Sequence, residues 1–191
     1  MPMSDKKQQI IDAATQSFSL FGYKATTMDQ VAKMANVGKG TIYTFFKSKE
    51  ELLDHIVSSV ISEIKHEADA AMDDRLPFSE NVQRALQRIF TFRQEHELTI
   101  KLLQEVRDIG TAAVREVMKR LDREMIAYIR EKIEEAMAKG EIRPCDPELT
   151  AFFMFKMYIA LSIEWEKEHE PLSQQTIAEL FDLYLLKGLS P

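Results

Sequence analysis

The sequence predicts an all-α fold, in which an N-terminal three-helix helix-turn-helix domain is joined by a long helix to a C-terminal helical bundle. Apolar residues recur every three or four positions along most of the 191-residue chain, which is the spacing of amphipathic helices. No stretch alternates apolar and polar residues convincingly in the manner of a strand. Residues that cap or end helices separate the periodic segments.

The first three expected helices lie within residues 4–46, and the third of them is short. Ser4 is a candidate N-cap for the first helix, and Gly22 is expected to end it. The apolar face of this helix consists of Ile11, Ala14, Phe18 and Phe21. Thr27 is expected to begin the second helix, because Gln30 stands three residues later and completes a capping box. A turn at residues 36–38 then precedes a third helix that runs to about residue 46.

Longer helices are expected in the rest of the chain. Ser48 and Glu51 repeat the capping pattern at the start of a long fourth helix. Its apolar stripe consists of Leu52, Leu53, Ile56, Val60, Ile61 and Ile64. Glycine and proline residues separate the further helices, which are expected near residues 78–95, 98–107, 111–139, 146–168 and 173–187.

The composition is typical of an ordered soluble protein, with 45% hydrophobic and 29% charged residues. The single cysteine, Cys145, excludes an internal disulfide and fits a reducing compartment. No apolar segment follows the first lysines, so we expect no secretion signal. The longest weakly charged stretch, Leu149–Ile163, is interrupted by Lys156 and is shorter than the roughly 20 residues of a membrane span. We therefore expect a cytoplasmic location and no membrane partner.

Charge is divided unevenly along the chain, whose net charge is −6. Residues 1–50 contain seven lysines and four acidic residues, which gives +3. The remainder contains 18 basic and 27 acidic residues, which gives −9. A basic head on an acidic body is the pattern expected of a nucleic-acid reader that carries a separate regulatory domain, although the net charge alone argues against nucleic-acid binding.

Residues 27–46 have the spacing of a helix-turn-helix. The small residue Ala32 stands where the two helices must touch. Asn36 stands in the turn, where a residue that tolerates left-handed backbone angles is required. Val31, Val37 and Ile42 are spaced to anchor the second helix of the motif against the first.

The outward face of the third helix has short or hydrogen-bonding side chains, and two glycines that let the backbone approach a DNA groove closely. Lys39 suits guanine, and Thr41 and Thr44 suit base edges. The residues suited to phosphate oxygens are Thr27, Tyr43, Lys47 and Lys49. Two alternatives remain open: Tyr43 and Phe46 as core aromatics, and Lys47 as a solvated lysine.

This head resembles the DNA-binding domain of the tetracycline-repressor (TetR) family. The resemblance covers roughly residues 5–55 and rests on residues 22–28, on Val31-Ala32, and on residues 37–52, which read Val-Gly-Lys-Gly-Thr-Ile-Tyr-Thr-Phe-Phe-Lys-Ser-Lys-Glu-Glu-Leu. It implies base contacts from Lys39, Gly40, Thr41 and Thr44, and phosphate contacts from Thr27, Tyr43 and Lys49. Gly38 departs from the family, which usually has a helix-capping serine there, so one DNA contact is expected to be missing.

The resemblance also implies a domain division and a mode of action. Residues 1–50 would form the DNA-binding domain, and residues 51–191 a dimerisation and effector-binding domain. The protein would be a transcriptional regulator, a ligand-responsive repressor that binds a pseudo-palindromic operator in double-stranded DNA as a homodimer. The alternative is a protein of the same fold that acts through protein contacts or DNA architecture, without a small-molecule effector.

Enzymatic and metal-dependent functions are not expected. The sequence has no nucleophile–base pairing, glycine-rich phosphate loop or metal-ligand cluster, so we expect no catalytic residues, no cofactor and no metal. No two of the four histidines are four residues apart, as ligands on one helix face would be: His55, His66, His96 and His169. The apolar stretch from Phe152 to Trp165 fits core packing, a partner subunit or an effector pocket, so the sequence assigns no effector-binding residue.

Overall fold

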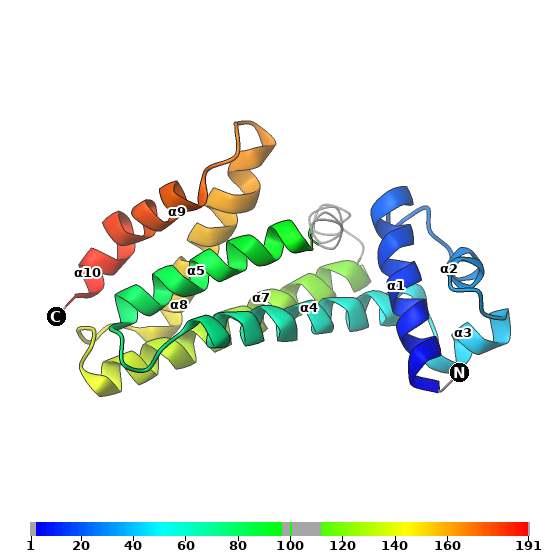
Figure 1. The fold of residues 1–191 in the computed structure, drawn as a ribbon, viewed down its shortest axis with the longest axis horizontal. Coiled ribbons are helices and arrows are strands. Elements are labelled where there is room, and N and C mark those ends of the chain that lie inside the picture. Colours follow the sequence, from blue (N-terminus) through cyan, green and yellow to red (C-terminus); the bar gives the residue numbers. More distant parts are fainter. Residues whose placement is uncertain (1–2, 97–99, 101–111, 191) are drawn as a thin grey trace. The chain divides into compact units, whose positions relative to one another are not determined.

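The computed structural model describes residues 3–96, 100 and 112–190, and within these ranges every regular element is a helix (Figure 1). The all-α prediction is therefore confirmed. The chain divides into two compact units, Met1–Val60 with Glu95–Leu121, and Ile61–Gln94 with Asp122–Pro191. The helix predicted at 98–107 lies almost wholly outside the described residues.

The first unit contains three whole helices and parts of two long ones. Helix α1 spans Met3–Phe21, α2 spans Met28–Met34 and α3 spans Lys39–Phe45. Helix α4 (Lys49–Ala71) begins in this unit, and α7 (Ala112–Lys139) contributes its first residues. The side chains that form the centre of the unit are fully or almost fully buried: Ile10, Ala14, Phe18, Val31, Ala32, Ile42, Leu52, Leu53 and Val57.

One expectation for the core of this unit is wrong. Phe21 was predicted to continue the apolar face of the first helix, but its side chain is 58% exposed. The reason is local, since α1 ends at Phe21 and Gly22 turns the chain with a φ of 83°. Tyr23, two residues later, is buried instead, and its ring lies 5.2 Å from that of Phe18.

The predicted helix ends follow from local hydrogen bonds. Thr27 and Gln30 form both bonds of the capping box, at 3.2 Å and 2.7 Å. Asn36 adopts the predicted left-handed conformation with φ of 51°, and the following Val37 N–H donates to the Ala32 carbonyl at 2.9 Å. This arrangement is a Schellman motif, and it sets the path of the chain between α2 and α3.

The second unit is a helical bundle. It contains the rest of α4, most of α5 (Phe78–Glu95) and the larger part of α7. Helix α8 spans Pro147–Ile159 and α9 spans Gln174–Phe181. Their core includes Phe78, Val82, Ile133, Met154, Ile177 and Phe181.

The last two predicted helices keep their extent but change their winding. After α8 the chain continues as the π-helix η1 (Ala160–Glu164) and the 3-10 helix η2 (Trp165–Lys167). After α9 it continues as the π-helix η3 (Asp182–Leu186) and the short α10 (Lys187–Leu189). Helical periodicity in the sequence does not distinguish these variants, because each changes the number of residues per turn by less than one.

Two negative findings concern the described residues alone. None of their helices is both long and apolar enough to cross a membrane. No group of three or more histidine, cysteine, aspartate or glutamate side chains in this part of the chain is arranged to hold a metal ion.

Candidate DNA interface

Helix α3 packs against the first unit through one face, and its other faces are exposed or half-buried. Within the helix only Ile42 is buried, while Phe46 caps its end and is 3% exposed. Phe46 is thus a core residue, which resolves one of the open alternatives. Tyr43 is 44% exposed, so its side chain does not form part of the core. The remaining predicted base-reading positions, 39–41 and 44, are exposed or half-buried.

Lys39 makes a contact that the sequence did not suggest. Its ammonium lies 2.9 Å from the Asp29 carboxylate on α2, and both side chains are more than half exposed. The hydrogen bond and the negative charge of Asp29 raise the pKa of Lys39, which is therefore a cation at neutral pH. The two residues are ten positions apart, and only their opposite charge on the two motif helices could have suggested the pair.

The hydroxyl groups of Thr27 and Thr44 already form hydrogen bonds within the protein. Each hydroxyl can still form one further hydrogen bond with DNA. The Thr27 hydroxyl oxygen accepts from the Gln30 N–H, so its own proton is free to be donated to a phosphate. The Thr44 hydroxyl donates to the Gly40 carbonyl at 3.0 Å. Its oxygen therefore remains an acceptor for a base amino group, and its methyl group suits a thymine methyl.

The two glycines of the motif have different surroundings. A Cβ atom added to Gly40 would meet nothing within 4 Å, so this point of α3 faces open space. Gly38 is the N-cap of α3 and, having no side chain, leaves the helix without a side-chain capping bond. The first turn of α3 therefore lacks the side-chain capping bond that a serine at this position could make.

The two predicted phosphate-binding lysines also differ. Lys47 is exposed, and its backbone N–H donates to the Glu51 carboxylate at 2.6 Å. Lys49 is half-buried, and its ammonium contacts the carbonyl oxygens of Tyr23 at 2.7 Å, Thr26 at 2.9 Å and Lys24 at 3.4 Å. No residue pattern indicates these contacts, because the partners are backbone atoms more than twenty residues away.

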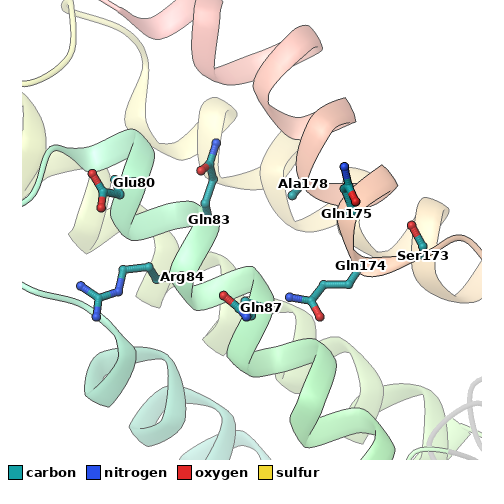
Figure 2. Close-up of a pocket in the computed structure, with 8 residues that line it drawn as sticks. All are labelled: Glu80, Gln83, Arg84, Gln87, Ser173, Gln174, Gln175 and Ala178. Carbon is teal, nitrogen blue, oxygen red and sulfur yellow. The ribbon is translucent and has the colours of Figure 1, made fainter.

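Two polar features stand out in the second unit. Arg93 pairs with Glu166 at 3.2 Å, while the Arg93 Nε atom and the nearby Tyr158 hydroxyl are buried with no hydrogen-bond partner in the described part of the chain. Burial raises the pKa of the Tyr158 phenol against the opposing charge of Arg93. Separately, a polar groove of about 620 Å³ lies between α5 and α9 (Figure 2). Four glutamines line it together with Glu80, Arg84, Ser173 and Ala178.

The described geometry defines a class of protein. A left-handed turn between two short helices, the second of which exposes lysine, threonine, tyrosine and glycine, is a helix-turn-helix that presents a recognition helix to DNA. Residues 10–56 match the family "Bacterial regulatory proteins, tetR family", and residues 76–189 match "Tetracyclin repressor-like, C-terminal domain". The chain belongs to the TetR family and is a DNA-binding transcriptional regulator.

A sequence relative agrees with this assignment, and solved structures share the fold. The chain is 59% identical over 186 residues to the HTH-type transcriptional regulator YhgD of Bacillus subtilis, an alignment that covers 97% of each protein. Its fold is similar to that of FadR from Bacillus subtilis in complex with stearoyl-CoA, with a TM-score of 0.79 and 21% identity over 95% of this chain and 98% of the other. The SmeT–triclosan complex also has a TM-score of 0.79, with 21% identity over 95% of this chain and 90% of the other.

Proposed function

We propose that this regulator is a ligand-responsive repressor that binds a pseudo-palindromic operator as a homodimer. The exposed polar face of α3 is the observation that carries the DNA-binding part of the proposal. Its base contacts are Lys39, Gly40, Thr41 and Thr44, and its phosphate contacts are Thr27, Tyr43 and Lys47. Lys49 has a different set of partners, which are three backbone carbonyls.

The division of labour between base and phosphate contacts can be tested by titrating DNA at several salt concentrations. Tyr43→Phe should weaken binding to all sequences, because a phosphate contact carries no sequence information. Lys39→Ala should relax the preference at one base position. Equal losses on every sequence from both changes would refute the assigned roles.

Homodimer formation is supported by apolar side chains exposed in the second unit. Leu149 and Phe153 lie four residues apart on α8, and they are 52% and 56% exposed. On η3, Leu183 and Tyr184 are 54% and 72% exposed. A second copy of the chain would remove these side chains from water, and a two-fold dimer would place two heads on half-sites about one DNA turn, or a multiple of it, apart.

The dimer proposal predicts an effect on mass. Phe153→Glu should convert a dimer into a monomer in analytical ultracentrifugation and abolish operator binding, because a charge would be buried at the subunit interface. A matched exposed substitution outside these helices, Leu20→Glu, should leave the dimer intact. A wild-type protein that sediments as a monomer at operator-binding concentrations would contradict the proposal.

An effector is proposed to bind within residues 51–191 and to change the spacing of the two heads through α4. Release of DNA requires that the ligand bind the two states with different affinities. The unpaired donors of Arg93 and Tyr158 support a ligand that carries an acceptor oxygen, such as a carbonyl or an anionic group. Stearoyl-CoA and triclosan are suitable first probes, because they occupy the similar FadR and SmeT structures.

Ligand binding can be tested by thermal shift. A probe that binds the body should raise the melting midpoint and lower operator affinity, and Tyr158→Phe should reduce both effects. Gln87→Ala in the groove between α5 and α9 is the matched control and should leave both unchanged. If the groove variant loses the response and Tyr158→Phe keeps it, the ligand binds in the groove instead.

The proposal also includes the location of the protein in the cell and the kind of activity it has. We propose a cytoplasmic location, because an operator-binding regulator acts on the chromosome. The matched family consists of transcriptional regulators, so the proposed activity is binding and not catalysis.

A further inference from the structure

The strongest unassigned feature lies where α4 begins, against the turn between α1 and α2. The Lys49 ammonium meets three backbone carbonyls there, at 2.7, 2.9 and 3.4 Å. The same ammonium lies 4.4 Å from the centre of the buried Tyr23 ring, which is within cation–π range. One lysine therefore contacts both the backbone and the aromatic side chain of a single turn.

The number of N–H donors on the Lys49 ammonium limits how many acceptors it can bind at once. An ammonium group has three N–H donors and no acceptor. Three carbonyl oxygens already surround the ammonium of Lys49, so a phosphate contact would require it to give up one of them. Burial lowers the pKa of Lys49 while the charge of Glu50 acts against that shift, which is consistent with a partly desolvated amine.

The turn that Lys49 contacts is held from its other side as well. The buried Thr26 hydroxyl lies 3.0 Å from the Ser17 hydroxyl and 3.1 Å from the Ser17 carbonyl. The Tyr23 ring packs against Phe18 of α1. These contacts join α1, the turn and the start of α4. The residue that directly follows Thr26 is Thr27, the N-cap of α2.

We propose that Lys49 is a positioning residue, which ties the turn before the helix-turn-helix to α4 and so sets the place of Thr27 on the DNA backbone. This role differs from the phosphate contact that the family resemblance implies. It rests on the proposed phosphate contact of Thr27. Lys47, two residues earlier and exposed, is the lysine that contributes the ionic contact at this end of the interface.

The first experiment uses the wild-type protein. Amine acetylation, followed residue by residue by mass spectrometry, should modify Lys49 ~10-fold more slowly than Lys47 in the free protein, because its hydrogen bonds to three carbonyls must break before the amine reacts. This cost opposes, and should exceed, the gain in unprotonated amine that the lowered pKa of Lys49 brings. Adding operator should protect Lys47 and leave Lys49 unchanged. A Lys49 amine that reacts as fast as Lys47 and becomes protected only by DNA would overturn the proposal.

The second experiment separates positioning from charge. Lys49→Met should lower the melting midpoint of the free protein by about 3–8 °C, weaken operator binding, and leave the salt dependence of binding unchanged. Lys49→Arg should not restore the wild type, because a planar guanidinium does not fit three converging carbonyls. In the control Lys47→Met, the midpoint should not change, while the slope of log affinity against log salt should fall by about 0.9.

A double-mutant cycle tests whether Lys49 acts through Thr27. Thr27→Ala should weaken operator binding in the wild-type background and have little further effect in the Lys49→Met background. Additive losses, or a reduced salt slope that Lys49→Arg restores, would establish a direct phosphate contact instead. If the wild type binds no operator, the proposed function fails, while the acetylation and melting results still report on the contacts of Lys49.

Discussion

Replacing Gly40 with alanine is a perturbation whose effects on stability and on DNA binding should have opposite signs. Gly40 is the second residue of α3, and an added Cβ atom would meet nothing within 4 Å in the free protein. The methyl group would point into the space that the proposed interface assigns to DNA. The free protein should therefore accept the substitution, while the complex should not.

The expected magnitudes follow from helix propensity and from the cost of a lost contact. Glycine within a helix is less favourable than alanine by roughly 0.5–1 kcal/mol, so the melting midpoint should rise by about 1–4 °C in a chain of this size. In the complex the methyl group would separate the α3 backbone from the base edges. Losing one good base contact costs about 1–3 kcal/mol, which corresponds to an operator affinity about 5–150-fold weaker.

The assay combines thermal melting with fluorescence anisotropy on operator DNA. Gly188→Ala is the matched control, since Gly188 lies on α10 and its added Cβ would be 3.9 Å from Arg143, an ordinary contact. The control should leave operator affinity unchanged. Wild-type affinity in Gly40→Ala would refute the close approach of α3 to DNA, and a lowered midpoint would refute the open space at Gly40.

Three further predictions concern single contacts. Asp29→Asn should raise affinity for all DNA sequences by about 2–5-fold in anisotropy titrations, because it frees Lys39 and removes a negative charge from the interface; unchanged affinity would contradict this. Gly38→Ser should add a capping bond to α3 and raise the melting midpoint by about 1–2 °C; a lower midpoint would show that the serine does not cap. Burial alone would raise the pKa of Asp69, but hydrogen bonds from Tyr128 and a lysine lower it, so the stability from this carboxylate is present at pH 7 and lost as the pH falls below about 4. Tyr128→Phe should therefore cost about 0.5–1 kcal/mol in urea unfolding at pH 7, and this cost should decrease as the pH falls from about 4 through the lowered pKa of Asp69. A cost that stays constant over that range would contradict the linkage.

The features that could be predicted from the sequence are those set by neighbouring residues. The capping box of Thr27 and Gln30 depends on atoms three residues apart, and the left-handed turn depends on the backbone preference of Asn36. The burial of Ala32 and Ile42 follows from helical periodicity. The extents of the helices were predictable for the same reason, since periodicity and caps are local signals.

The features that could not be predicted depend on residues far apart in the sequence. The exchange of Phe21 for Tyr23 in the core depends on how the chain turns after α1, which the apolar pattern alone does not fix. The carbonyl contacts of Lys49 join residues that are 23–26 positions apart and involve backbone atoms that carry no sequence signature. The Lys39–Asp29 pair depends on the angle between α2 and α3.

The central claim is that the exposed face of α3 reads the DNA sequence, and one titration tests it most directly. Wild-type protein and the Lys39→Ala variant are each titrated against an operator from the protein's own upstream region and against its single-base-pair variants. We predict that Lys39→Ala loses discrimination at one position of each half-site, by about 1–3 kcal/mol, and keeps it at the others. A uniform loss at every position, or no change at any, would contradict the claim.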